Sequence, residues 1–285
     1  MAFQRNAQIL GSRLKVQHDL DEFLWRFLID YLEKLDTSSR LARSIDALFA
    51  FEEVSHVFDP EHPQVFSDGF SKLRDLRLTL FGTKCQSVVE CIREYQAPEN
   101  VESNIDGKTE NGKNIAALRT RRIVKAPIIL MVKIDRIRAS ARGNAVKDRH
   151  RLVQFDQELD MSEFTRDADA DADGDGDGPS LLYDLAMVQV HDGRFASRGH
   201  YICYVNHGLE MIASPSSSKD SQRLWSRVSD TEIDSVSWNT VSRTYKGNEV
   251  AVGLVYVRRD MRHNVLLGPS PPPSTHSTKK HKSTQ

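Results

Sequence analysis

One strongly amphipathic helical segment is followed by a series of short apolar runs, and this order restricts the possible folds more than any other feature of the chain. In residues 19–35, DLDEFLWRFLIDYLEKL, apolar side chains recur with the period of an α-helix. A second helical pattern covers residues 39–57, and Pro60 and Pro63 are expected to end it. The first part of the chain therefore predicts two helices.

The apolar runs that come after residue 64 are rich in β-branched and aromatic residues and predict strands. The predicted strands are APIILMVKIDRI at 126–137, LLYDLAMVQVH at 181–191, GHYICYV at 199–205, LEMIA at 209–213 and VAVGLVYVRR at 250–259. Helices followed by strands are typical of an α+β fold, not of alternating βαβ units. We predict one α+β domain over residues 1–260 and a disordered tail, rich in Pro, Ser, Thr and Lys, over residues 261–285.

Cysteine content and hydropathy indicate the cellular environment. The chain of 285 residues has only three cysteines, Cys85, Cys91 and Cys203, which are too few and too irregularly spaced for a disulfide framework. Its first residues have no apolar signal-peptide core, and no window approaches the roughly 18 apolar residues of a membrane-spanning helix. We expect a cytoplasmic or nuclear protein that does not contact a membrane.

Two oppositely charged blocks lie next to each other in the sequence. Residues 113–151 contain 12 lysines and arginines against two acids, a net charge of +10. Residues 154–177 contain ten acids and one arginine, a net charge of −9. A basic block can bind nucleic acid, but this one lacks interleaved aromatic residues. Mutual screening of the two blocks is the favoured interpretation, and nucleic acid is not expected as a partner.

No metal or cofactor is expected. The segment RDADADADGDGDGP at 166–179 begins like an EF-hand calcium loop, but the twelfth position is Ser180 where a bidentate Glu is needed, and no helix flanks the segment. Cys85 and Cys91 have no second cysteine pair and cannot complete a four-ligand zinc site. We interpret the acidic segment as a solvated insertion and these two thiols as structural.

His200 is the strongest candidate for a chemical role. It follows Gly199 at the head of a strand-like run, directly after the loop sequence HDGRFASRG at 191–199. A glycine at this point lets another group approach the histidine closely. A neutral imidazole there could act as a general base.

A polar pair further along the chain could orient this imidazole. The sequence LWSRVSD at 224–230 predicts a strand that ends in Ser229 and Asp230. A carboxylate on a neighbouring strand could accept the Nδ1–H of His200 and fix its tautomer, as in a catalytic triad. Cys203 lies three residues beyond His200 on the same strand, so it faces the opposite side and cannot be the nucleophile that His200 activates.

Four segments match, in order, the sequence pattern of one enzyme family. They are QHDLDEFLWRFLIDYL at 17–32, against Q-Q-D-A-x-E-F-L; APIILMVKIDRI at 126–137, against L-P-P-x-L-x-x-x-L-x-R-F; YDLAMVQVHDG…RGHYICYV at 183–205, against Y-x-L-x-A-V-x-x-H-x-G…G-H-Y-x-A-Y; and residues 224–260, against W-x-x-[FY]-[DN]-D-x-x-V…A-Y-x-L-x-Y. Over residues 15–260 the chain thus resembles the ubiquitin-specific proteases, thiol proteases that cleave ubiquitin from its conjugates. The spacing of Trp238 is similar to that of the subgroup whose fingers region lacks zinc.

The resemblance implies a partial papain-like cysteine protease fold, in which part of a helical thumb accompanies an antiparallel sheet that forms the palm and fingers. It implies that ubiquitin or a ubiquitinated protein is the partner and that His200 is the general base. The family's orienting Asp or Asn falls on Ser229, which has no carboxylate or amide, so the adjacent Asp230 is the candidate for this role.

The same resemblance identifies a missing part. In the family the nucleophile lies before the Q-Q-D-A helix, in a G-N-T-C box at a helix N-terminus, where the helix dipole lowers the pKa of the thiol. Residues 1–16, MAFQRNAQILGSRLKV, contain neither this cysteine nor the oxyanion-hole Asn of the box. Cys85 and Cys91 follow the helix, in the wrong order. We expect this chain to be inactive as it stands.

Three interpretations stay open. The chain is the larger, C-terminal part of a ubiquitin-specific protease whose start is not included, or it is a catalytically dead pseudo-deubiquitinase that binds ubiquitin or a partner. In the third, it is an unrelated α+β module whose basic block contacts nucleic acid.

Overall fold

The structure is a computed structural model that describes residues 40–80, 84–139, 145–165, 181–195, 198–211, 225–244 and 248–261. The predicted helix at 19–35, the acidic insertion at 166–179 and the tail after residue 261 lie outside the described residues. In the described part, no helix is long and apolar enough to cross a membrane.

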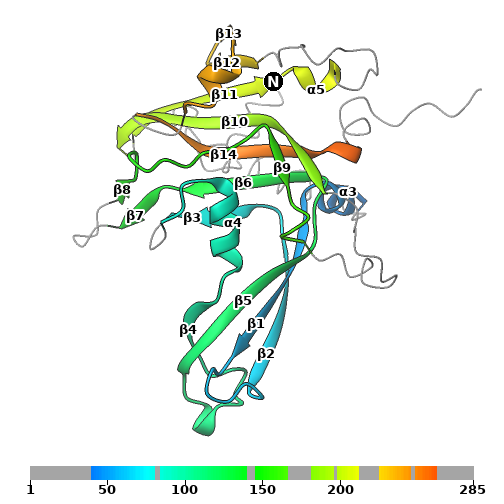
Figure 1. The fold of residues 1–285 in the computed structure, drawn as a ribbon, viewed down its shortest axis with the longest axis vertical. Coiled ribbons are helices and arrows are strands. Elements are labelled where there is room, and N and C mark those ends of the chain that lie inside the picture. The colour runs from blue at the N-terminus through cyan, green and yellow to red at the C-terminus, as the bar shows by residue number, and fades with distance from the viewer. Residues whose placement is uncertain are drawn as a thin grey trace, which may run out of the picture.

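The larger of the two main sheets forms the body of the molecule (Figure 1). Its strand order is β13-β12-β11-β10-β14-β6-β3, and β9 also pairs with β10. Every pairing is antiparallel except that of β3 with β6, which is parallel. The strands are β3 (Leu76–Thr79), β6 (Ile129–Asp135), β9 (Glu158–Asp160), β10 (Leu182–Phe195), β11 (Arg198–Asn206), β12 (Trp225–Ser229), β13 (Glu232–Val236) and β14 (Glu249–Arg258).

A four-stranded antiparallel sheet extends away from this body along the long axis of the molecule (Figure 1). Its order is β2-β1-β5-β4, formed by β1 (Phe51–Phe58), β2 (Phe66–Leu73), β4 (Glu99–Ser103) and β5 (Ile115–Lys125). A separate small ribbon pairs β7 (Ile137–Ala139) with β8 (Ala145–Lys147). We refer to the four-stranded sheet as the finger sheet.

The α-helices of the described chain are few and mostly short: α3 (Arg40–Phe49), α4 (Val88–Gln96), α5 (Gly208–Met211) and α6 (Trp238–Val241). The start of α4 is well specified by its sequence. Ser87 is the N-cap and accepts a hydrogen bond from the backbone N–H of Glu90, whose carboxylate in turn accepts one from the backbone N–H of Gln86. The helix ends at Gln96, because Pro98 cannot continue it.

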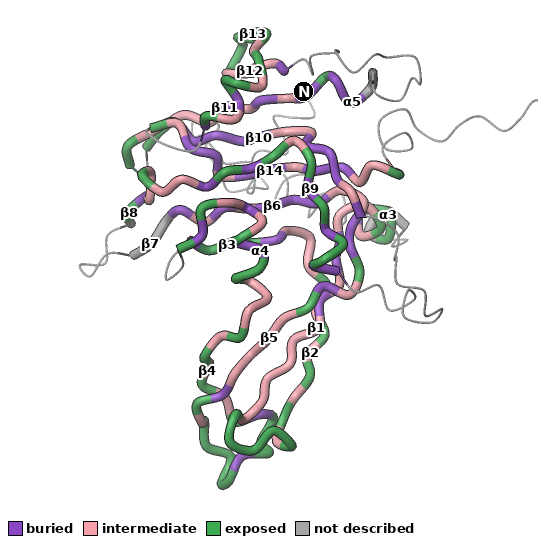
Figure 2. Tube along the Cα trace, viewed as in Figure 1, coloured by how far each residue is buried: buried purple, intermediate pink, exposed green. Residues whose placement is uncertain are grey.

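The hydrophobic core lies in the body and reaches α4. It contains fully buried side chains from β3, β6, β10, β14 and α4, among them Leu76, Leu78, Ile92, Val132, Ile134, Tyr183, Leu185, Val188, Val190, Leu254 and Tyr256. Figure 2 shows buried residues concentrated in the body strands, whereas the finger sheet is mostly half-buried or exposed. Because β6, β10 and β14 are central strands, they read as long apolar runs in the sequence, which is why the sequence identifies them.

The structure confirms the predicted strands at 126–137, 181–191, 199–205 and 250–259 as β6, β10, β11 and β14. The strand predicted at 209–213 is wrong, since residues 208–211 form α5. The Asn206 side chain explains this turn of the chain. It donates to the carbonyl of Leu185 at 2.9 Å and accepts the N–H of Gly208, also at 2.9 Å, so β11 ends there and the chain bends.

The helix predicted over residues 39–57 is correct only for its first half. The described helix α3 ends at Phe49, and the following residues form β1. The segment FEEVSHVF is rich in aromatic and β-branched residues, and it pairs with β2 on one side and β5 on the other. Tertiary pairing therefore overrides the helical period in this segment.

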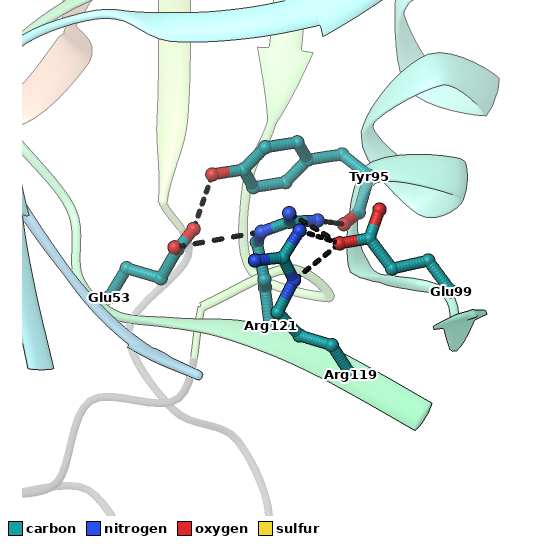
Figure 3. A network of polar contacts seen from close by, with 5 residues as sticks. All are labelled: Glu53, Tyr95, Glu99, Arg119 and Arg121. Carbon is teal, nitrogen blue, oxygen red and sulfur yellow. Dashed lines mark hydrogen bonds and ion pairs between the residues drawn. The ribbon is translucent and has the colours of Figure 1, made fainter. Parts of the chain in front are cut away.

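Arginines of the basic block balance their charge on the finger sheet (Figure 3). Arg121 contacts Glu99 at 2.6 Å and Glu53 at 4.0 Å, and Arg119 also pairs with Glu99. The hydroxyl of Tyr95, on α4, donates to the buried Glu53 carboxylate at 2.5 Å. Burial and the nearby Glu53 carboxylate raise the pKa of Tyr95. Neither glutamate belongs to the acidic block, so the predicted screening between the two blocks does not account for these arginines.

Candidate functional site

The hairpin formed by β10 and β11 is built around two glycines. A Cβ atom on Gly199 would lie 2.3 Å from Nε2 of His191 and 2.5 Å from the carbonyl oxygen of Asp192. A Cβ atom on Gly193 would lie 2.6 Å from the carbonyl oxygen of Arg198. All three distances are shorter than Cβ atoms show in real structures, so the two strands can approach this closely only with glycine.

The space at Gly199 is used by the ring of His191, and not by a group that approaches His200. The buried His191 ring lies against Gly199 and contacts the ring of Tyr201 at a centroid distance of 4.9 Å. His200 lies on the opposite side of the strand from Tyr201 because neighbouring strand residues alternate. The glycine of the RGH sequence therefore positions the hairpin, and His200 follows as the next residue of β11.

His200 is brought together with both members of the predicted polar pair. Its Nε2 is hydrogen-bonded to the hydroxyl oxygen of Ser229 at 2.8 Å and lies 3.7 Å from a carboxylate oxygen of Asp230. The prediction that the orienting group meets Nδ1 is wrong, since both partners lie at Nε2. The His200 side chain is 34% exposed and that of Asp230 81% exposed, so the carboxylate faces solvent and its charge is screened.

A turn allows two successive residues to reach one nitrogen atom. Ser229 is the last residue of β12, and Asp230 begins the tight turn that leads to Glu232, the partner of Ser229 on β13. Asp230 has a φ of 52°, in the left-handed region, which Asp tolerates better than most residues. This bend turns Asp230 to the same side as Ser229, where a regular strand would place them on opposite sides.

Sequence reasoning missed one residue of this site, Lys147 at the end of β8. Its buried Nζ donates to the carbonyl oxygens of His191 at 2.9 Å, Gly193 at 2.7 Å and Asn248 at 3.3 Å. Burial lowers the pKa of Lys147 to about 8, and the positive charge of Arg136 adds to the shift. In the sequence Lys147 is one of 12 basic residues of the block, and no local signal distinguishes it from exposed neighbours.

None of the three cysteines is placed as a nucleophile for His200. Cys85 precedes α4 and Cys91 lies in it, and both are buried in the core; burial together with the neighbouring Cys85 raises the pKa of Cys91 to about 12. Burial also raises the pKa of Cys203, which is half-buried on β11 three residues from His200. A thiol must lose its proton to attack, so these shifts disfavour nucleophilic chemistry at Cys91 and Cys203. Among the described residues no group of His, Cys, Asp and Glu could hold a metal ion.

The described fold is α+β, and it places a partly exposed histidine at the start of β11 with its Nε2 beside polar groups at the end of β12. The family model for ubiquitin carboxyl-terminal hydrolase matches residues 2–256, and the chain belongs to this family, as a catalytic domain of the ubiquitin-specific protease type with a partial papain-like fold.

Individual relatives agree with this assignment. Ubiquitin C-terminal hydrolase 15 of Oryza sativa subsp. japonica is 29% identical over 197 residues, which cover 67% of this chain and 17% of the rice protein. The SAGA Ubp8/Sgf11/Sus1/Sgf73 DUB module bound to ubiquitin aldehyde has a TM-score of 0.66 and 20% identity, over 90% of this chain and 52% of that chain. A Ubp8 variant of the module bound to monoubiquitin has a TM-score of 0.65 and 21% identity, over 90% and 51% of the two chains. This chain thus spans about half of the solved chains and a smaller part of the rice protein.

Proposed function

We propose that this chain is a ubiquitin-binding deubiquitinase-like domain in which His200 is the general base of cysteine-type isopeptide hydrolysis. The observation that carries the proposal is the contact of its Nε2 with Ser229 at 2.8 Å and with Asp230 at 3.7 Å. Ubiquitin is the proposed partner because Ubp8 modules of the same fold are bound to ubiquitin aldehyde and to monoubiquitin.

The contacts at Nε2 define what each residue would contribute. In this proposal the Ser229 hydroxyl oxygen accepts the Nε2–H of the imidazole, so the lone pair that accepts a thiol proton is on Nδ1. The negative charge of Asp230 favours the imidazolium that forms when the imidazole takes the thiol proton and the resulting thiolate attacks the isopeptide carbonyl. The imidazolium then returns this proton to the departing lysine amine. In the second step the imidazole takes a proton from water, the water attacks the thioester, and the proton passes to the departing thiolate.

Residues 1–285 alone are proposed to bind ubiquitin without cleaving it. The burial of Cys85, Cys91 and Cys203 supports this second role, because it leaves no exposed thiol near His200 among the described residues. Reading the genomic DNA upstream of the Met1 codon distinguishes a protease that continues there, with an in-frame G-N-T-C box, from a pseudo-deubiquitinase. The three unpaired cysteines are consistent with the proposed location in the cytoplasm or nucleus.

The activity prediction can be tested on the purified chain. We expect titration calorimetry to show ubiquitin binding, and we expect no hydrolysis of a ubiquitin–fluorophore amide and no labelling by ubiquitin that carries a C-terminal electrophile. Loss of the nucleophile leaves at most the residual catalysis of binding and dipoles. Labelling that Cys85→Ala or Cys91→Ala abolishes would contradict the proposed absence of a nucleophile, and absence of binding would contradict ubiquitin as the partner.

A further inference from the structure

Lys147 connects two parts of the backbone that are far apart in the sequence, through three carbonyl oxygens. Its Nζ reaches β10 through His191 and Gly193, and it reaches the residue before β14 through Asn248. An ammonium group has three N–H donors, and here each is matched by a carbonyl oxygen. Figure 1 shows β8, which ends in Lys147, beside the end of the body where β10 and β11 connect.

The strand register relates these carbonyls to His200. Asp192, the residue between the two carbonyls of β10 that Lys147 binds, is the Cα partner of His200 in the β10–β11 pairing. Regular pairing stops there, because the register shifts between Asp192 and Phe195. Gly193 donates its N–H to the Asn248 carbonyl at 3.3 Å, so Lys147 binds both residues of this contact. The ammonium thus holds the last regular pair of the hairpin, the one that contains His200.

We propose that Lys147 is a positioning residue for His200: it fixes the turn end of the β10–β11 hairpin through three backbone carbonyls and so keeps the imidazole on Ser229. The significance of this role for catalysis rests on the proposed function, whereas the positioning itself can be measured without any turnover.

The test is chemical modification of the histidines in the 285-residue chain. Diethyl pyrocarbonate acylates accessible, unprotonated imidazole nitrogens, and mass spectrometry gives the rate at each histidine. His56 provides an internal reference, because its ring is 41% exposed and hydrogen-bonded to Asp68 at 2.6 Å, in the finger sheet. In Lys147→Met we expect the modification rate at His200 relative to His56 to rise about threefold or more. This is the size of effect expected when the hydrogen bond between His200 and Ser229 is weakened.

Lys113→Met is the matched control, because Lys113 is an exposed member of the same basic block. It should leave the ratio of His200 to His56 unchanged. If Lys147→Met has no cooperative melting transition, Lys147→Arg is tested by the same criteria, since a planar guanidinium cannot meet three carbonyls that converge on one nitrogen. The expected increase is then smaller but still confined to His200.

Two results would overturn the proposal: an unchanged ratio in a folded Lys147 variant, or rates that rise equally at His200 and His56, which is what general destabilisation produces. Either result leaves the proposed function intact. That function fails separately if His200→Ala retains full activity in a chain completed with a cysteine-bearing segment.

Discussion

Ser229 and Asp230 contact the same nitrogen but differ in what they can supply. The Ser229 hydroxyl is at hydrogen-bonding distance, whereas the Asp230 carboxylate is 3.7 Å away and largely exposed. Exposed ion pairs contribute roughly 0–1 kcal/mol and weaken in salt. The sequence favours Asp230 over Ser229 as the residue that orients His200, because only Asp230 is charged. In the structure Ser229 makes the closer contact.

This difference predicts a ranking in the chain completed with the family's G-N-T-C segment. Ser229→Ala should lower kcat about tenfold, as expected for one lost hydrogen bond to an ionising group. Asp230→Ala should lower kcat only about threefold at physiological salt and more at low salt, and His200→Ala should abolish turnover. Steady-state kinetics on a ubiquitin–fluorophore amide at two ionic strengths measures this. A hundredfold loss in Asp230→Ala beside a near-normal Ser229→Ala would reverse the ranking.

Lys147 predicts a specific pH dependence of stability. Its pKa is about 8 in the folded chain and 10.5 for the unperturbed group, so between these values the unfolded state binds more protons and the free energy of unfolding rises with pH. The charged groups around it are Asp192, which raises its pKa, and Arg136 and Arg149, which lower it.

In urea denaturation, the free energy of unfolding of the wild-type chain should therefore be higher at pH 10 than at pH 7.5 by an amount on the order of 1–3 kcal/mol. Lys147→Met should lack this increase. Burial also lowers the pKa of Arg136, to about 10, and this group is present in both proteins, so the comparison isolates the effect of Lys147. An identical pH slope in the two proteins would show that Lys147 does not change its protonation on unfolding in this range.

At the scale of elements, the β10–β11 hairpin depends on the absence of a side chain at Gly199. An Ala Cβ there would meet the His191 ring and the Asp192 carbonyl, so Gly199→Ala should destabilise the chain by about 1–3 kcal/mol, the usual cost of overpacking. Gly253→Ala on β14 is the control, since its Cβ would lie 3.1 Å from the Gln189 side chain, which is a much milder contact than those at Gly199. Chemical denaturation of both variants tests this, and equal losses would contradict it.

The elements that the sequence predicts correctly are those whose surroundings agree with their local pattern. Strands β6, β10, β11 and β14 are rich in apolar and β-branched residues, and they are interior strands of the body sheet, where such side chains are buried. The segment at 51–57 has a helical period, yet β2 and β5 pair with it, and residues 208–211 form α5 because Asn206 bends the chain before them. Pairing partners and turn-forming side chains act from outside the window that a sequence pattern covers.

The same limit applies to the site. His200, Ser229 and Asp230 are visible in the sequence because each lies at the end of a predicted strand, next to a motif. Their meeting at Nε2 depends on the left-handed turn at Asp230, which no periodicity indicates. Lys147 is 44 residues from His191 and 101 from Asn248 in the chain, so its role appears only in three dimensions.

The molecule as a whole has an uneven distribution of buried surface, with a well-packed body and a finger sheet that is half-buried at most positions (Figure 2). Phe70 is 65% exposed and Phe66 40% exposed on β2, the eight-residue strand at one edge of the finger sheet as described. Exposed apolar residues on an edge strand favour edge-to-edge association. We expect the isolated chain to aggregate, or to need a partner to stay in solution.

A substitution on β2 tests whether this strand is the cause. Phe70→Thr, which keeps a high β-propensity, should slow aggregation several-fold in light scattering at constant protein concentration. Ile233→Thr is the matched control, because Ile233 is 71% exposed but lies on the short edge strand β13 beside Glu232 and Asp234. If only Ile233→Thr slows aggregation, the associating edge strand is β13 and not β2. A sharp melting transition of a wild-type monomer at high temperature would contradict the expected aggregation itself.

The packing of Gly193 and Gly199 has a consequence for how relatives of this chain are interpreted. Both glycines are needed for the two strands to approach and for His191 to fit, whether or not any bond is cleaved. Purifying selection for folding alone would therefore preserve the HDG…RGH pattern long after an enzyme had lost its activity. In a genome survey, drift at Ser229 and Asp230 would be the better sign of a relaxed catalytic requirement, and an intact histidine box should not by itself be counted as a working protease.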